Sequence, residues 1–309
     1  MNLDFTEMKV LKQFAFLMLV AVLGFSCSDF FNKEIPISLE DHRSLLVVNS
    51  ILGEGQEELL FGITTSRSMT DTTSLIITPR DLDIDLILNS DSYLPVSYDS
   101  SRNLYYSTYK VQSGDVFELN VKSEAYPEVE AETRVPMPAR ILDARIGARA
   151  FDSNGRPVRE IFFTVEDIEG EQNFFFMDLI MTREEWGNIS DVSTFESPLR
   201  FFRRAEFRES LAFNDTFFEN ASVELMLWMA EEEFQNMIYN LPDFYVRLYT
   251  VDKPMYDYFT QLHVHLRNRN ADLFAGEPIN VPSNVKGGFG VFGSHSFMDF
   301  KLDYQEFLD

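Results

Sequence analysis

Short apolar runs separated by turn-forming residues fill the chain between residues 43 and 136. Residues 81–88 alternate most strictly, and residues 116–121 and 129–135 alternate in the same way. A period of two is the pattern of a half-buried β-strand, because successive side chains of a strand point to opposite faces. Repeated short strands are typical of an antiparallel sandwich, so we predict an immunoglobulin-like β-sandwich of about seven strands over residues 43–136.

Pro136 and Pro138 interrupt this pattern. Proline cannot donate a hydrogen bond to a strand ladder and holds the preceding residue extended, so we predict a domain boundary here. Beyond the boundary, residues 161–168 and 173–181 are expected to form a hairpin. We predict that residues 139–309 form a second β-rich domain.

One helix is expected near the C-terminus, after two further strands over residues 222–229 and 244–251. Four apolar residues follow one another at spacings of four, three and four, which places them on one helical face: Met255, Phe259, Leu262 and Leu266. The predicted fold is therefore mainly β, with a sandwich first, a second β-rich domain after it and a short helix near the C-terminus.

The front of the chain has the layout of a bacterial secretory signal. Lys9 and Lys12 precede an uncharged, largely apolar run over residues 13–26, and the small residue Ser26 stands directly before Cys27. Cys27 is the only cysteine of the chain. In bacterial lipoproteins a cysteine in this position receives a diacylglycerol and becomes the first residue of the mature chain.

Lipidation of Cys27 explains why a secreted chain keeps one unpaired thiol. Plain cleavage with a free thiol and a retained transmembrane helix are the alternatives. The helix is disfavoured because Phe14–Phe25 gives only 12 residues, whereas about 20 are needed to span a bilayer. We predict a lipoprotein signal peptide over residues 1–26 and a polar tether over residues 27–42. Met1 and Met8 both stay open as the start of translation.

The charge of the chain excludes one large class of partners. Fifty acidic residues stand against 26 basic ones, which gives a net charge of −24. Such a surface repels nucleic acid and anionic lipid head groups, so we expect no nucleic-acid binding. A hydrophobic content of 45% is enough for a folded core, and the 30 Phe and 12 Tyr residues favour β structure.

Several motifs together resemble a known family. They are Leu46-Val47-Val48-Asn49, Ser113-Gly114-Asp115, Glu132-Thr133-Arg134-Val135-Pro136 and Ser283-Asn284-Val285-Lys286-Gly287-Gly288-Phe289-Gly290-Val291-Phe292. With the signal before Cys27, the chain resembles the Bacteroidota lipoproteins of the domain of unknown function 4249, from the signal to about Ser296. This family has no established activity, so no catalytic residues carry over. The resemblance implies an outer-membrane-associated protein, often encoded beside TonB-dependent receptors.

Two motifs of the C-terminal segment imitate catalytic or cofactor sites. Residues 288–293 spell G-x-G-x-x-G, but only 16 residues follow Gly293, too few for the strand–helix–strand unit of a dinucleotide site. We expect tight turns and close backbone approach instead. Ser294-His295-Ser296 lacks the glycine that a nucleophile elbow needs two places after its serine. We therefore predict no catalytic residues and no cofactor.

Two other groups imitate metal sites. His263 and His265 would share one face of a strand, but on the predicted helix they lie about 200° apart and cannot converge on one ion. Residues 81–85 start like a calcium loop, yet Leu86 and Ser92 stand where such a loop needs Gly and Glu. Alternation with Leu and Ile makes the aspartates the wet face of a strand, so we predict no metal site.

Residues 183–220 carry no clear pattern and are left unassigned. Within them lies an arginine island, made of Arg200, Arg203, Arg204 and Arg208 with Phe201 and Phe202. Arginine and aromatic residues are enriched at interfaces, so the island is our first choice for a partner or ligand contact. The structural alternative, which we favour, is that nearby acids neutralise the arginines above a buried aromatic face.

We predict a non-enzymatic binding or accessory module, anchored to the outer membrane by the lipid on Cys27 and partnered with a TonB-dependent receptor. An envelope hydrolase with a site assembled from distant residues and a purely structural envelope protein are the alternatives. A hydrolase requires a pocket with converging carboxylates or histidines. The side of the outer membrane that the protein faces stays open.

Overall fold

The computed structural model describes most of the chain from residue 43 onward. The described residues are 43–68, 77–168, 170, 172–182, 189–191, 195–218, 221–240, 243–269 and 279–308. Arg43–Asp309 forms one compact unit. The predicted signal peptide, Cys27 and the tether lie outside the described residues. Within the described part, no helix has both the length and the apolar character that crossing a membrane requires.

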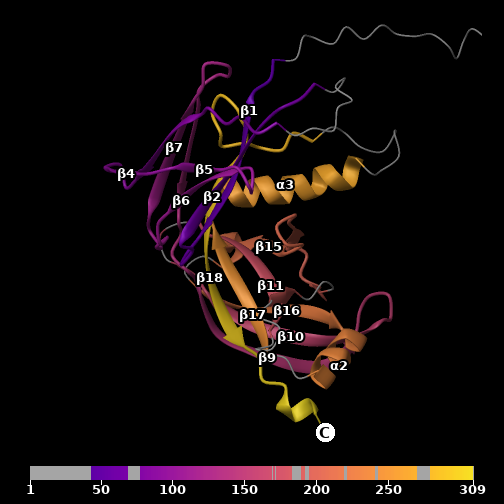
Figure 1. Ribbon diagram of the computed structural model, residues 1–309. Helices are drawn as coiled ribbons and strands as arrows, with labels where there is room; N and C mark the ends of the chain where they lie inside the picture. Colours follow the sequence, from indigo (N-terminus) through magenta and orange to yellow (C-terminus); the bar gives the residue numbers. More distant parts are fainter. Residues whose placement is uncertain are drawn as a thin grey trace, which may run out of the picture. The chain divides into compact units, whose positions relative to one another are not determined.

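Strands dominate the secondary structure (Figure 1). In chain order they are β1 (Leu46–Gly53), β2 (Glu58–Thr65), β3 (Asp83–Leu88), β4 (Ser92–Leu94), β5 (Ser97–Asp99), β6 (Leu104–Thr108), β7 (Val116–Lys122), β8 (Val129–Arg134), β9 (Arg140–Phe151), β10 (Pro157–Glu166), β11 (Phe174–Thr182), β12 (Ile189–Asp191), β13 (Phe195–Glu196), β14 (Arg203–Arg204), β15 (Leu211–Asn214), β16 (Ser222–Ala230), β17 (Asp243–Val251) and β18 (Phe289–Lys301). The helices are α2 (Glu231–Asn240) and α3 (Lys253–Arg269), with short 3-10 turns η1 (Asp215–Phe217) and η2 (Gln305–Phe307). The prediction of a mainly β chain with a helix near the C-terminus is confirmed.

One ten-stranded sheet joins the two halves of the chain. Its order is β14-β15-β11-β17-β18-β1-β2-β6-β5, with β12 paired to β11. β18 lies in the middle, antiparallel to β17 and parallel to β1. Two four-stranded sheets, β4-β3-β7-β8 and β13-β16-β10-β9, complete the fold. Strands from both predicted domains thus share one sheet, and the division into residues 43–136 and 139–309 stays a prediction.

The first core lies between β4-β3-β7-β8 and the β18-β1-β2-β6 part of the long sheet. The alternation read from the sequence is confirmed on β3, where Leu86 and Leu88 are buried and Asp83 is exposed. Phe61 of β2 and Phe117 of β7 are fully buried in the same core. Each side chain of this size stabilises the fold by about 1.5–3 kcal/mol when it leaves water.

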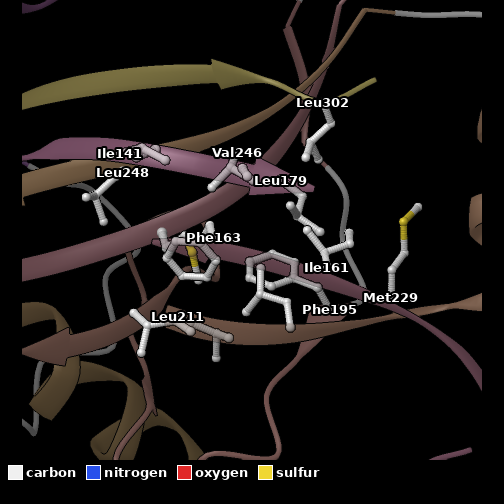
Figure 2. Close-up of a cluster of buried hydrophobic side chains, with 14 of the residues drawn as sticks. Ile141, Ile161, Phe163, Leu179, Phe195, Leu211, Met229, Val246, Leu248 and Leu302 are labelled. Atoms are coloured by element: carbon white, nitrogen blue, oxygen red, sulfur yellow. The ribbon is translucent and has the colours of Figure 1, made fainter. Parts of the chain in front are cut away.

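The second core lies between β13-β16-β10-β9 and the β15-β11-β17 part of the long sheet. Figure 2 shows Phe163 of β10 near Leu248 and Val246 of β17, and Leu179 of β11 close by. The opposite face of the long sheet is covered by α3, whose Met255 and Tyr256 are buried among aromatic side chains of β11 and β17. β11 is therefore buried on both faces.

The hairpin predicted from residues 161–168 and 173–181 is wrong. β10 pairs with β9 and β16, whereas β11 pairs with β12, β15 and β17 in the other sheet. β11 is buried on both faces because the second core covers one face and α3 with its aromatic neighbours covers the other, and this position exists in the long sheet beside β17. Asn173 fixes the crossing between the layers, because its side-chain amide donates to the Ile168 carbonyl at 2.9 Å.

The glycine-rich motif lets β18 enter the sheet at close range, which confirms the structural interpretation of G-x-G-x-x-G. Gly290 has φ +105°, and a Cβ there would lie 2.0 Å from the Val48 carbonyl oxygen. Only glycine fits such a position. Beside it, the Asn284 side chain accepts from the Phe292 N–H at 3.0 Å and donates to the Phe292 carbonyl at 2.7 Å. The amide thus replaces a neighbouring strand.

A buried polar cluster lies where β8, β18 and the start of α3 meet. We name it the polar joint; its members are Thr133, Asp252 and Ser294. The Thr133 hydroxyl lies 2.8 Å from the Ser294 Oγ and 2.5 Å from Asp252 Oδ2. Asp252 also caps α3, since its Oδ1 accepts from the Met255 N–H at 3.0 Å. Burial raises the pKa of Asp252 to about 6, against the hydrogen bonds that lower it.

Candidate functional site

The arginine island lies on the segment that joins β13 to β15 through the two-residue strand β14. Arg200, Arg203 and Arg208 are exposed, and Arg204 is half-buried. Arg204 and Arg208 are also anchored, Arg204 by main-chain carbonyls and Arg208 by the buried Asp178. The structure therefore separates two anchored arginines, Arg204 and Arg208, from Arg200 and Arg203.

Arg204 is held by main-chain carbonyls. One terminal nitrogen of its guanidinium donates to the Glu209 carbonyl at 2.9 Å, and the other donates to the Phe195 carbonyl. The guanidinium carbon also lies 5.4 Å from the centre of the Phe195 ring. Burial lowers the pKa of Arg204, and Glu196 and Glu209 oppose this electrostatically. The cation is thus desolvated and bonded to neutral acceptors.

Arg208 stands in a tight turn with unusual backbone angles. Arg208 and Glu209 have φ values of 52° and 58°, and the turn closes through a hydrogen bond of 2.9 Å from the Ser210 N–H to the Phe207 carbonyl. Left-handed backbone costs a residue other than glycine about 1–2 kcal/mol. The turn brings the Arg208 Nε to 3.5 Å from Oδ2 of Asp178, whose side chain is only 2% exposed.

The aromatic members of the island belong to the cores. Phe201 and Phe202 stack with ring centres 4.9 Å apart and pack on the second core. Phe202 meets Phe213 edge-on at 5.0 Å. Phe207, which lies between Arg204 and Arg208 in the sequence, packs instead against the aromatic cluster under α3. The exposed part of the island is therefore made by Arg200, Arg203 and Arg208.

A cavity lies beside Arg204. Its volume is about 170 Å³, and its walls come from the turn between β9 and β10 and from β10, β13, β14 and β16. The lining residues are Asp152, Arg156, Pro157, Val158, Glu196, Arg204, Trp228 and Ala230. Of these residues, sequence reasoning singled out Arg204 alone.

The carboxylate of Asp152 is fully engaged inside its own turn. It accepts from the backbone N–H groups of Asn154 and Arg156, both at 2.8 Å, and from the Arg156 Nε at 2.6 Å. These hydrogen bonds, with that from the Arg156 backbone first, hold the pKa of Asp152 below its usual value. Glu196 lies nearer the solvent, with its side chain 60% exposed. Of the two acidic residues that line the cavity, Asp152 is therefore hydrogen-bonded within its own turn and Glu196 lies at the rim.

Trp228 supplies an unsatisfied donor in the cavity wall. Its Nε1–H is buried and has no hydrogen-bond partner. Leaving a buried donor unpaired costs about 1–3 kcal/mol, so such a group calls for an acceptor. The sequence held a partial signal, because Leu225, Leu227 and Met229 alternate with Trp228 and take the core face of β16. The tryptophan had to face the other way.

The remaining sequence candidates do not converge. His263 Nδ1 lies 3.2 Å from a Glu206 carboxylate oxygen, and His265 Nδ1 lies 3.1 Å from the Ile279 carbonyl oxygen. Ser294 belongs to the polar joint, while the neighbouring His295 ring contacts Phe207 and is therefore on the other face of β18. Across the described residues, no group of three or more His, Cys, Asp or Glu side chains is placed to hold a metal ion.

A model of the domain of unknown function 4249 matches residues 32–300. The chain belongs to this family. No curated protein matches this family member. It is similar to a crystal structure of a DUF4785 family protein from Legionella pneumophila, with 12% sequence identity and a TM-score of 0.22. That alignment covers 66% of this chain and 52% of the other, about half of its length, and a TM-score this low supports no argument.

In this member of the DUF4249 family, the longest motif that carried the resemblance builds structure. Gly287, Gly288 and Gly290 each stand where a Cβ would meet a backbone oxygen, at 2.2, 2.5 and 2.0 Å. Thr133, from the motif Glu132-Thr133-Arg134-Val135-Pro136, belongs to the polar joint. The family motifs therefore hold β18 in place, and the arginine island and the cavity beside it lie on other elements.

Proposed function

We propose that this DUF4249 member is a lipid-anchored, non-enzymatic binding module of the outer membrane that docks a partner through its arginine island. The observation that carries the proposal is the division of the island. Arg204 is fixed by the Phe195 and Glu209 carbonyls and Arg208 by the buried Asp178, and Arg200 and Arg203 lie exposed on the same segment. A chain with a net charge of −24 thus presents a small basic surface on a braced segment.

Bracing matters because flexible arginines bind at an entropic cost. An arginine side chain carries about 2 kcal/mol of rotamer entropy, part of which is lost on docking. Anchoring the turn through the Arg208–Asp178 pair and the two carbonyl bonds of Arg204 fixes the backbone under the exposed pair. The basic surface suits an acidic face of the partner, since complementary charge increases the association rate and the specificity.

The membrane part of the proposal is supported by the sequence around Cys27. We expect the parent chain to partition into the detergent phase and the Cys27→Ser variant into the aqueous phase, because the serine hydroxyl does not receive the lipid. Mass spectrometry of the mature N-terminus checks the modification directly. Equal partitioning of parent and variant would refute the lipid anchor.

The partner part rests on the family resemblance, which points to a TonB-dependent receptor. Crosslinking in native membranes, followed by pull-down and mass spectrometry, should recover a β-barrel receptor with the parent chain. The double variant Arg200→Glu/Arg203→Glu should recover much less of it. The matched control is Arg134→Glu/Arg140→Glu, which changes the charge equally at two exposed arginines outside the island. Equal recovery with both double variants would exclude the island as the docking surface.

A further inference from the structure

One edge of β18 is left open where β1 turns away from it. β1 pairs with β18 only as far as Gly53 and His295, whereas β17 stays paired with β18 as far as Lys301. Figure 1 shows β18 continuing beside β17 past the end of β1. Among the residues that the structure describes, residues 296–301 therefore have a neighbouring strand on one side alone.

Two hydrogen bonds show which backbone groups of β18 face this open edge. The Ser294 carbonyl accepts from the Asp252 N–H, which directly follows β17. The His295 carbonyl accepts from the Glu54 N–H, which directly follows β1. Successive residues of an antiparallel strand direct their backbone groups to opposite sides. The even-numbered residues of β18 therefore bond to β17, and the odd-numbered residues after His295 face the open edge.

Three residues thus present backbone donors and acceptors at the edge, namely Phe297, Asp299 and Lys301. All three are exposed, and no residue of the described part bonds to their N–H and C=O groups on this side. The pairing of β18 with β17 has no register shift, so these groups form a regular row. β9, the edge strand of the other layer, is instead broken by two register shifts. A regular unpaired edge is a template for another strand, whereas a bulged edge is protected.

An extended polypeptide is the ligand whose hydrogen bonds match this row. The three donors and three acceptors repeat at every second residue, which is about 6.8 Å along a strand. Residues 297–301 have the length of a usual strand of about five residues. Addition of a strand to an exposed sheet edge takes its affinity from such main-chain bonds and its specificity from alternate side chains.

The side chains beside the edge limit the composition of the added segment. On the core side, Met298 and Phe300 are partly buried and pack on the second core, so a strand beside them would bury apolar residues there. On the outer side, the charges of Asp299 and Lys301 are already paired. The net charge of −24 repels an acidic segment. The edge therefore suits a segment with apolar alternate residues and no net negative charge.

We propose that the open edge of β18 at residues 297–301 binds an extended segment of a partner polypeptide by strand addition, with apolar residues of that segment against Met298 and Phe300. A second copy of this chain fits poorly, because two chains of charge −24 repel each other. Antiparallel pairing of the two edges would also set Asp299 opposite its own copy, and like charges so placed are destabilising. The proposal goes beyond the receptor docking described above, because it concerns β18 and not the arginine island.

A short peptide tests the edge directly. The probe is acetyl-Lys-Thr-Val-Thr-Val-Thr-Lys-amide, which alternates and carries positive charge. In a ¹H–¹⁵N spectrum of the full chain, we expect it to move the amide signals of Phe297, Asp299 and Lys301 downfield to saturation, because these amides gain acceptors. The amides of Met298 and Phe300 face β17 and should move much less. Absence of a saturable shift at the three edge amides, or equal shifts at all five, would overturn the proposal.

N-methylated peptides separate strand addition from non-specific contact. When the valines lie against Met298 and Phe300, the threonine N–H groups point at β18 and the valine N–H groups point away from it. Methylation of the threonine nitrogens should weaken binding about tenfold or more. Methylation of the valine nitrogens, the matched control, should leave the affinity of the unmodified peptide. Equal affinity of the two methylated peptides would overturn the proposal.

Two variants at one position test the protein side of the same bonds, with calorimetry as the readout. Asp299→Pro removes the central donor of the edge and keeps the ladder with β17, because the Asp299 N–H faces the open side. It should weaken peptide binding about tenfold or more. Asp299→Ala removes the same carboxylate, keeps the N–H and should bind like the parent chain. Parent-like affinity in Asp299→Pro would overturn the proposal.

If Asp299→Pro does not fold, the methylated peptides on the parent chain still decide the question. Sedimentation tests the competing occupant of the edge. We expect the parent chain to show no association through β18 at any concentration. A concentration-dependent dimer that Asp299→Pro abolishes and Asp299→Ala retains would overturn the proposal, because a second copy would then take the edge.

Discussion

Replacing Asp252 by Asn tests whether the polar joint stores an electrostatic cost. Asp252 lies against Thr133 and caps α3 through the Met255 N–H, and burial raises its pKa to about 6. Asn keeps an oxygen that can cap the helix and removes the charge. The substitution therefore isolates the cost of burying an ionised carboxylate at this point.

The magnitude follows from the two pKa values. The ordinary value is 3.8 and the folded value is about 6, and a difference of one unit corresponds to about 1.4 kcal/mol. The folded state keeps a proton that the unfolded state releases. Asp252 therefore contributes stability below about pH 4 that is lost as the pH rises through about 6, with a total change of about 3 kcal/mol. Between pH 4.5 and 7.5 the loss is about 2 kcal/mol.

Urea unfolding of the parent and Asp252→Asn at pH 4.5 and 7.5 measures this loss. We expect the free energy of unfolding of the variant, relative to the parent, to increase by about 2 kcal/mol from the lower to the higher pH. The matched control is Asp257→Asn, which removes one negative charge from a partly exposed position of the same helix. Its effect on the free energy of unfolding should be below about 1 kcal/mol.

The reasoning would be refuted by a difference between parent and Asp252→Asn that stays constant across this pH range. It would also be refuted by a variant that is less stable than the parent at pH 7.5, because the cap and the Thr133 contact would then outweigh the burial of charge. The large net charge of −24 also changes with pH, but it changes almost equally in both proteins and cancels in the difference.

Three further substitutions probe other parts of the fold. Gly290→Ala should lower the free energy of unfolding by about 3 kcal/mol or more in urea, because its Cβ would lie 2.0 Å from the Val48 oxygen in backbone of positive φ. Glu209→Gly should raise the thermal midpoint by a few degrees, since it relieves about 1 kcal/mol of left-handed strain. Glu231→Gln should cost about 3 kcal/mol in urea unfolding, because the Arg159 guanidinium, only 10% exposed, loses its charged partner at 2.7 Å. An effect of Gly290→Ala or Glu231→Gln below 1 kcal/mol, or a lower midpoint for Glu209→Gly, would contradict these interpretations.

The sequence predicted the strands and the helix that bury one face and expose the other. β3 was visible because Leu86 and Leu88 alternate with Asp83 and Asp85, and α3 because its apolar residues repeat at helical spacing. β11 misled the prediction, since its run of Phe and Met fits a hairpin strand as well as an inner strand. Its pairing with β17 is set by packing between layers, which a local pattern does not contain.

The candidate site was predictable in part. The sequence pointed to Arg204 as a member of the arginine island, because arginines and phenylalanines are clustered there in an otherwise acidic chain. The other walls of the cavity come from positions far away in the sequence, namely Asp152, Arg156 and Trp228. Two strand pairings bring them together: β10 on β16, which sets Val158 opposite Ala230, and β13 on β16, which sets Glu196 opposite Trp228. The unsatisfied indole donor is visible only when those neighbours are in place.

Site-specific photocrosslinking tests the central claim most directly. A photoreactive residue at the position of Arg203 reports what touches the island in native membranes, and one at the position of Tyr239, which is 88% exposed on α2, serves as the control. The account predicts a crosslink to a β-barrel receptor from position 203, none from position 239, and loss of the crosslink in Cys27→Ser. The same products from both positions, or none from position 203, would contradict it.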